Sequence, residues 1–195
     1  MIESLKPFYN SILKPIALFL NRIGFTPNLL TIAGVVFFAI GAWLTAVGYW
    51  RIALIFFIIG SCIDGLDGVL ARETDRKTAF GAILDSVCDR ITEILWFGSI
   101  ILYFTVQPII DKTGICMGFA ALTGSLMVSY IKARAEAEGI QCSVGLLQRP
   151  ERLILLSILQ LTGSVKIMTW GLGFIAVAAY LTALQRIYSV MKKRL

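Results

Sequence analysis

Residues 64–89 read DGLDGVLARETDRKTAFGAILDSVCD, and they place aspartates at positions 64, 67, 85 and 89 within a strongly hydrophobic chain. A carboxylate inside a membrane segment is energetically costly, and such residues usually mark a substrate or ion site. Four of them within 26 residues indicate a cation, a polar cavity or both. We therefore expect this stretch to form the functional centre of the chain.

The composition is that of an integral membrane protein. Hydrophobic residues make up 57% of the 195 residues, charged residues only 15%, and the mean hydropathy is +0.81. At about 20 residues per spanning helix, the length suits about six spans. The net charge of +6 does not come from one basic face, so nucleic acid is not an expected partner. Because the chain has no histidine, a Ser-His-Asp triad and a histidine-based zinc site are excluded.

The pattern of apolar segments predicts an all-α, polytopic membrane protein with a single domain over residues 1–195. Residues 1–26 would form an amphipathic juxtamembrane helix at the membrane surface, because their apolar residues recur at helical spacing. Residues 27–190 would form a bundle of six transmembrane helices. The expected spans are residues 29–49, 52–71, 80–104, 115–131, 150–161 and 167–188, with a turn beginning at Pro108 and the longest loop at 137–148.

The basic residues predict the orientation of this bundle. With six spans, all but three of the 18 Lys and Arg residues fall on the side that holds both chain ends; the exceptions are Arg51, Lys112 and Lys166. The positive-inside rule places the richer side in the cytoplasm. The aspartates lie at the same ends of the second and third spans, so we expect a site in the cell membrane that faces the cytoplasm.

The spacing of the aspartates predicts that they converge. Asp64 and Asp67 share one face of the second span, and Asp85 and Asp89 share one face of the third. Only the short polar segment 72–77 joins the two spans, which are therefore antiparallel neighbours. Converging carboxylates repel one another unless cations neutralise them, and all-oxygen sites suit Mg²⁺, Mn²⁺ or Ca²⁺. Four carboxylates can hold two ions, an arrangement used in phosphoryl transfer.

Three other interpretations compete with this one. The aspartates could form ion pairs with Arg72, Arg76 and Arg90 at the helix ends. A divalent-cation transporter would need polar residues that continue to the far membrane face, whereas residues 37–40 and 54–57 are apolar. A non-catalytic membrane scaffold does not require the aspartate pattern at all.

The aspartate stretch resembles the signature of the CDP-alcohol phosphotransferase family. The matching pattern is Asp64-xx-Asp67-Gly68-xx-Ala71-Arg72, eight residues, then Gly81-xxx-Asp85-xxx-Asp89, with every fixed position present. The resemblance implies an enzyme in which an alcohol replaces CMP on a CDP-lipid, with two divalent metal ions per site, either Mg²⁺ or Mn²⁺. It implies that Asp64, Asp67, Asp85 and Asp89 are metal ligands and that Asp89 is also the catalytic base for the acceptor hydroxyl.

The same resemblance implies a set of CDP-lipid contacts. Gly68, Arg72 and Thr78 correspond to residues that contact the cytidine diphosphate. The break at 27–31 is similar to the family segment near the nucleotide, which adds Asn28 and Thr31. The resemblance also implies a homodimer embedded in the lipid bilayer, with CDP-diacylglycerol or CDP-archaeol as the donor.

A second basic cluster indicates the acceptor alcohol. Lys132 and Arg134 end the fourth span, and Arg152 opens the fifth. A cytoplasmic loop needs such residues for orientation alone, but arginine also binds phosphate through two nitrogens. Residues 85–90, 129–136 and 144–152 resemble the phosphatidylinositol-phosphate synthase and archaetidylinositol-phosphate synthase branch of the family. That branch implies inositol 1-phosphate as the acceptor, bound by Lys132, Arg134 and Arg152; glycerol 3-phosphate is the alternative.

Overall fold

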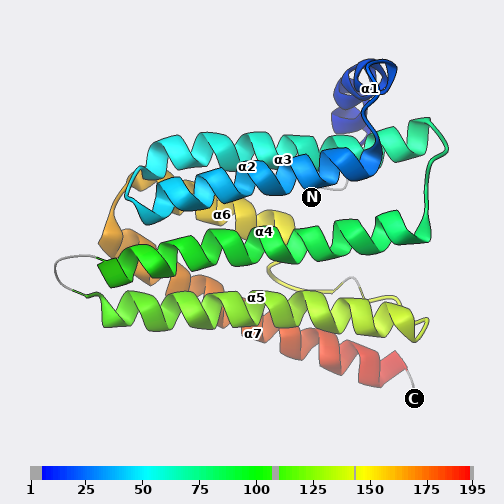
Figure 1. Cartoon of the computed structure of the whole chain (residues 1–195). Coiled ribbons are helices and arrows are strands. Elements are labelled where there is room, and N and C mark those ends of the chain that lie inside the picture. Colours follow the sequence, from blue (N-terminus) through cyan, green and yellow to red (C-terminus); the bar gives the residue numbers. More distant parts are fainter. Residues whose placement is uncertain (1–5, 107–109, 143, 194–195) are drawn as a thin grey trace. The chain divides into compact units, whose positions relative to one another are not determined.

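All regular secondary structure is helical in the computed structural model, which describes residues 6–106, 110–142 and 144–193 (Figure 1). Within these ranges there are seven helices and no strand: α1 (Lys6–Arg22), α2 (Pro27–Ala46), α3 (Trp50–Glu73), α4 (Ala79–Val106), α5 (Lys112–Ala137), α6 (Arg149–Thr162) and α7 (Val165–Lys193). Four of them, α2, α3, α5 and α7, are long and apolar enough to cross a membrane. The prediction of an all-helical, multi-pass membrane protein is confirmed.

The two remaining predicted spans correspond to α4 and α6, and neither of these described helices has the length and composition of a membrane span. The charged residues of α4, which are Asp85, Asp89, Arg90 and Glu93, all lie at or before residue 93, and this leaves only residues 94–106 as an uncharged apolar run. With 14 residues, α6 is about 21 Å long, less than the roughly 30 Å of a hydrocarbon core. The turn expected at Pro108 lies outside the described residues.

The chain folds into two compact units. The first contains the described residues up to Gly41 together with Ile55–Leu95, and the second contains Ala42–Leu54 together with the described residues from Trp96 onward. All predicted metal and CDP-lipid residues lie in the first unit. The predicted acceptor residues Lys132, Arg134 and Arg152 lie in the second.

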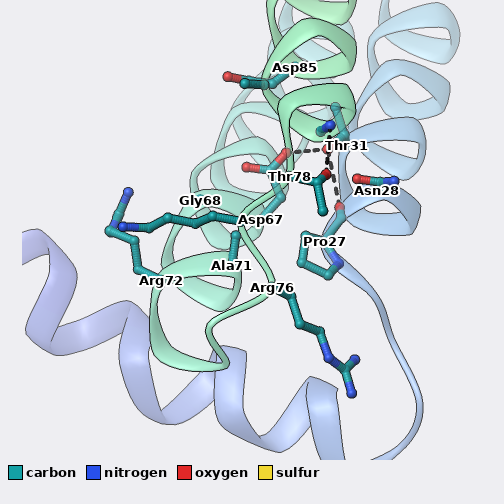
Figure 2. A pocket seen from close by; sticks show the side chains of 13 residues that line it. Pro27, Asn28, Thr31, Asp67, Gly68, Ala71, Arg72, Arg76, Thr78 and Asp85 are labelled. Carbon is teal, nitrogen blue, oxygen red and sulfur yellow. Dashed lines mark hydrogen bonds between the residues drawn. The ribbon is translucent and has the colours of Figure 1, made fainter.

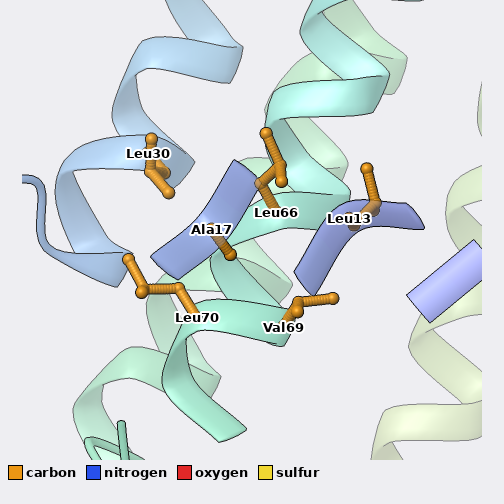
Figure 3. Close-up of a cluster of buried hydrophobic side chains, with 6 residues drawn as sticks. All are labelled: Leu13, Ala17, Leu30, Leu66, Val69 and Leu70. Atoms are coloured by element: carbon orange, nitrogen blue, oxygen red, sulfur yellow. The ribbon is translucent and has the colours of Figure 1, made fainter. Parts of the chain in front are cut away.

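In the first unit, α1 packs against α3 through apolar side chains. Figure 3 shows this cluster, which consists of Leu13, Ala17, Leu30, Leu66, Val69 and Leu70. Helix α1 continues without a break through Pro15. Its Lys14 Nζ lies 2.6 Å from Glu73 Oε2 at the end of α3. Since α3 turns by about 100° per residue, Asp64 lies on the face opposite this cluster, and Asp67 lies between that face and the cluster.

In the second unit, a buried glutamine joins the end of α6 to other elements. The side chain of Gln160 accepts a hydrogen bond from Trp96 Nε1 at 2.6 Å and donates to Thr45 Oγ1 and to the Trp50 carbonyl, both at 3.0 Å. These bonds satisfy both ends of the amide, as burial requires. The helix then stops at Gly163, whose left-handed φ of 66° suits glycine.

Candidate active site

Three of the predicted metal ligands converge in the first unit. One carboxylate oxygen each from Asp64, Asp67 and Asp85 lies within 4.8 Å of the other two. Two oxygens bound to one ion can be no farther apart than twice the metal–oxygen distance, which is about 4–5 Å for Mg²⁺ and Ca²⁺. Asp67 is 6% exposed, so water screens the repulsion among these anions poorly there. The acidic oxygens and their spacing fit a hard divalent cation, and we call this group the aspartate triad.

The triad forms because two helix ends meet across a short connector. Asp64 and Asp67 lie one turn apart near the end of α3, and Asp85 lies in the second turn of α4. Thr78 caps the start of α4, because its Oγ1 accepts a hydrogen bond from the Gly81 amide at 2.9 Å. The connector thus fixes where α4 begins and, through the helical repeat, which way Asp85 points.

The fourth predicted ligand, Asp89, is not a member of the triad. It lies one helical turn after Asp85 on α4, and its Oδ2 is 3.8 Å from Arg90 Nη1. Arg90 also donates a hydrogen bond of 2.5 Å to the Ser86 carbonyl in the preceding turn. Of the ion pairs that the sequence offered as an alternative, the one between Asp89 and Arg90 is therefore present. Asp89 still lies on the same face of α4 as Asp85.

A pocket of about 320 Å³ opens beside the triad (Figure 2). Its wall includes Asp67 and Asp85 and all five residues predicted to contact the CDP-lipid: Asn28, Thr31, Gly68, Arg72 and Thr78. This volume lies at the lower end of the usual range for small-molecule sites. The prediction from the motif and from the break at 27–31 therefore identified residues of one cavity, contributed by α2, α3, α4 and the connector.

Two basic residues line the pocket although the sequence did not predict a ligand-binding role for them. Arg76 and Lys77 belong to the connector between α3 and α4, and both line the pocket together with Arg72. The feature of the sequence that could have indicated this role is their position in the short polar segment directly after Arg72. The pocket therefore combines acidic residues with three cations, a combination that suits a metal-bound diphosphate.

The start of α2 faces the same pocket. Thr26 caps this helix, since its Oγ1 accepts a hydrogen bond from the Leu29 amide at 3.3 Å, and Pro27 and Asn28 form its first turn on the pocket wall. A helix N-terminus carries partial positive charge. A Cβ at Gly81 would lie 3.0 Å from Thr78 Oγ1 and 3.3 Å from Asn28 Oδ1, so glycine keeps this part of the pocket open.

The basic residues of the second unit differ in their surroundings. Lys132 Nζ lies 3.7 Å from Glu136 Oε1, and Arg134 donates a hydrogen bond of 2.8 Å to Glu138 Oε1; both pairs are on the surface. Arg152 is fully buried, and its Nη1 donates to the Leu147 carbonyl at 3.1 Å. Of the three predicted acceptor ligands, Arg152 is thus the one in an enclosed setting.

A further buried arginine, Arg186, was not assigned a role from the sequence. It lies on α7, is 4% exposed, and donates hydrogen bonds to the carbonyls of Val144 at 2.9 Å and Val128 at 2.6 Å. These contacts hold the loop before α6 against α5 and α7. Buried guanidinium groups are rare, and their hydrogen bonds to backbone carbonyls offset part of their desolvation cost.

Comparisons with known proteins agree with the motif. The family model described as CDP-alcohol phosphatidyltransferase matches residues 25–191. An archaetidylinositol phosphate synthase of Pyrococcus horikoshii is 34% identical over 194 residues, covering 99% of this chain and 98% of the relative.

Solved structures agree as well. A crystal structure of Mycobacterium tuberculosis phosphatidylinositol phosphate synthase with CDP-DAG bound superposes with a TM-score of 0.85 at 34% identity, covering 92% of this chain and 94% of that one. The same protein in complex with manganese and citrate gives a TM-score of 0.84 at 33% identity, covering 92% and 88%. From the matched motif, the family model and these relatives, the chain belongs to the CDP-alcohol phosphatidyltransferase family and is a transferase of phospholipid synthesis.

Proposed function

We propose that this enzyme transfers the phosphatidyl or archaetidyl group of a CDP-lipid to a hydroxyl of inositol 1-phosphate and releases CMP. The observation that carries the proposal is the aspartate triad, two members of which, Asp67 and Asp85, line a pocket. The same pocket is lined by three basic residues, Arg72, Arg76 and Lys77. This combination suits a diphosphate and a divalent cation. The names of the relatives support the choice of inositol 1-phosphate.

In the proposed complex, Asn28, Thr31, Gly68, Arg72 and Thr78 surround the cytidine diphosphate, and the lipid chains remain in the bilayer. Gly68 leaves room there, because a Cβ at this position would lie 3.3 Å from Arg72 Nη1. Arg72 can then approach the diphosphate across the glycine. A guanidinium binds phosphate oxygens through two parallel hydrogen bonds.

The proposed ion ligands are Asp64, Asp67, Asp85 and Asp89, with two Mg²⁺ ions per site and Mn²⁺ as a substitute. The crystal complex of the Mycobacterium tuberculosis enzyme with manganese supports a divalent-metal requirement. The chemistry that such ions supply when bound is neutralisation of the diphosphate and stabilisation of the oxygen that leaves with CMP. The four carboxylates hold the ions, and Asp67 does so from a buried position.

Asp89 is the proposed general base. The acceptor hydroxyl oxygen bonds to the phosphorus that carries the lipid, and the bond from that phosphorus to the bridging oxygen breaks. CMP departs with the bridging oxygen, and the proton of the hydroxyl passes to a carboxylate oxygen of Asp89. A base must lie within hydrogen-bond reach of the proton it accepts, and the helix face shared with Asp85 supports such a position for Asp89.

The acceptor phosphate is proposed to bind Lys132, Arg134 and Arg152. The burial of Arg152 supports this role, because charge-assisted hydrogen bonds are strongest away from water. Glycerol 3-phosphate carries the same phosphate, so the cluster by itself does not select inositol. The branch of the relatives favours inositol 1-phosphate.

The proposed setting is a cell membrane, with the site facing the cytoplasm and the whole chain acting as one catalytic domain. Six spans require α4 and α6 to cross as well, with the charged first part of α4 at the cytoplasmic interface and the short α6 accommodated by local thinning of the bilayer. Helix α1 then lies as an amphipathic helix at the cytoplasmic surface. In this arrangement nearly all Lys and Arg residues are cytoplasmic. We also propose a homodimer, in keeping with the family resemblance.

A CMP-release assay tests the proposal. Purified enzyme is incubated with CDP-diacylglycerol, CDP-archaeol or neither, with Mg²⁺, and with inositol 1-phosphate, free inositol or glycerol 3-phosphate. We expect CMP release that requires a CDP-lipid, Mg²⁺ and inositol 1-phosphate. Release with glycerol 3-phosphate alone would overturn the assignment of the acceptor, and rapid release without divalent metal would overturn the assignment of the site.

A further inference from the structure

The hydroxyl of Thr31 touches a proposed metal ligand. Thr31 Oγ1 on α2 is within short hydrogen-bond distance of Asp67 Oδ2 on α3, as the dashed line in Figure 2 shows. Both side chains are almost completely enclosed, with 4% of Thr31 and 6% of Asp67 exposed. From this contact we infer that Thr31 is a positioning residue that holds the Asp67 carboxylate in the orientation needed to bind the divalent cation. The inference rests on the proposed function and deepens it.

The single hydroxyl proton of Thr31 has two acceptors in reach. Besides Asp67, the Pro27 carbonyl lies 3.1 Å from Thr31 Oγ1, at the spacing of four residues that is common for threonine in helices. A hydrogen bond to an ionised acceptor is roughly twice as strong as one between neutral groups. The proton is therefore directed to Asp67 rather than to the Pro27 carbonyl.

The hydrogen bond from Thr31 restrains the Asp67 carboxylate and still leaves it able to bind a metal ion. A carboxylate has about four lone-pair sites on its two oxygens, and one bond to Thr31 uses one of them. The remaining sites are available to a cation shared with Asp64 and Asp85, whose oxygens lie within 4.8 Å. Carboxylate ligands are generally held by such outer hydrogen bonds, and the loss of one costs roughly 10- to 100-fold in metal affinity or activity.

The backbone of α2 comes close enough to α3 for a short side chain to make this contact. One turn after Thr31, a Cβ at Gly34 would lie 3.3 Å from the Gly60 carbonyl and 3.8 Å from Asp64 Cβ. Conversely, a Cβ at Gly60 would lie 3.1 Å from the Gly34 carbonyl and 2.7 Å from the ring of Phe38. Paired glycines let membrane helices approach closely. The crossing at Gly34 and Gly60 thus brings Thr31 within reach of Asp67.

This role differs from a direct contact between the Thr31 hydroxyl and the CDP-lipid. The hydroxyl proton is already donated to Asp67, so it is not available to a ligand in the pocket. A direct contact would change the KM for the CDP-lipid. A positioning role changes the affinity for the metal, including in the absence of any lipid substrate.

The test is a titration of Mn²⁺ into purified protein without substrate, followed by electron paramagnetic resonance of the free ion. We expect Thr31→Val to raise the dissociation constant for Mn²⁺ by roughly 10- to 100-fold, the range for loss of an outer hydrogen bond to a ligand. Thr31→Ser keeps the hydroxyl and should retain the wild-type affinity. Thr74→Val is the matched control, because Thr74 Oγ1 donates only to the Leu70 carbonyl of its own helix at 2.7 Å among its described contacts.

If Thr31→Val does not fold, Thr31→Ala provides the same comparison without a methyl group against the carboxylate. Unchanged Mn²⁺ affinity in the folded valine or alanine variant would overturn the inference. So would a raised KM for the CDP-lipid at saturating metal with no change in Mn²⁺ affinity. Because the titration needs no turnover, it separates the two proposals. If the Mn²⁺ affinity depends on the Thr31 hydroxyl but the protein releases no CMP, the proposed function alone is overturned.

Discussion

The charged residues that we propose as ligands differ between the two units in the charges that lie beside them. In the first unit, three carboxylates gather with their oxygens within 4.8 Å, and one of them is buried. In the second, Lys132 and Arg134 each have a glutamate partner on the surface, whereas Arg152, the third proposed acceptor residue, is enclosed. Gathered carboxylates need a cation, whereas paired surface cations are already balanced. The comparison favours a ligand site in the first unit, and it singles out Arg152 among the three proposed acceptor residues.

The largest expected effect comes from removing the proposed base in the first unit. Asp89→Asn should lower kcat by about 10²- to 10⁴-fold, the usual contribution of a general base. The affinity for the CDP-lipid should stay close to that of the wild type, because the triad and the pocket wall are intact. Single-turnover CMP release and equilibrium binding of the CDP-lipid measure the two quantities. Normal turnover of this variant would place the base elsewhere.

In the second unit, the expected effect of Arg152→Gln is smaller and confined to the acceptor. Hydrogen bonds to charged groups contribute about 1.5–3 kcal/mol, so the KM for inositol 1-phosphate should rise by about 10- to 100-fold. The KM for the CDP-lipid and the Mg²⁺ requirement should not change. Steady-state kinetics with each substrate varied in turn provide the measurement. An equal loss with both substrates would mean that Arg152 serves the fold rather than the acceptor.

Arg134→Ala gives the smallest expected effect and completes the contrast with Arg152. Its side chain is 65% exposed and lies 2.8 Å from Glu138. Exposed ion pairs are worth about 0.2–1 kcal/mol, so we expect the KM for inositol 1-phosphate to change by about fivefold at most. The same kinetic assay applies. A loss as large as that of Arg152→Gln would show that Arg134 leaves Glu138 to bind the phosphate, which would weaken the contrast drawn here.

The sequence predicted the first unit better than the second, and the reason is the distance along the chain. Asp64, Asp67 and Asp85 lie on two helices joined by a short connector, so the helical repeat alone brings their faces together. The pocket residues Asn28 and Thr31 were predicted only through the family resemblance. Their contact with α3 depends on the close crossing at Gly34 and Gly60, which no local pattern specifies.

The second unit depends on contacts between distant residues. Arg186 bonds to carbonyls 42 and 58 residues away, and nothing near it in the sequence marks it as buried. Gln160 was likewise unremarkable in the sequence, yet its three hydrogen bonds reach as far as Thr45. The predicted fifth span, residues 150–161, agrees with α6 within one residue at each end, and Gly163 directly after the helix marks its stop.

The most direct test of the central claim is Mn²⁺ binding by the wild type and by Asp85→Asn, measured by electron paramagnetic resonance without substrate. Asp85 supplies the only triad carboxylate from α4, so its amide should remove a ligand while leaving α3 unchanged. Asp75→Asn, in the connector, is the control with the same change of charge. We predict that the wild type and the control bind Mn²⁺ and that Asp85→Asn loses most of this affinity. Equal binding by all three proteins would contradict the account.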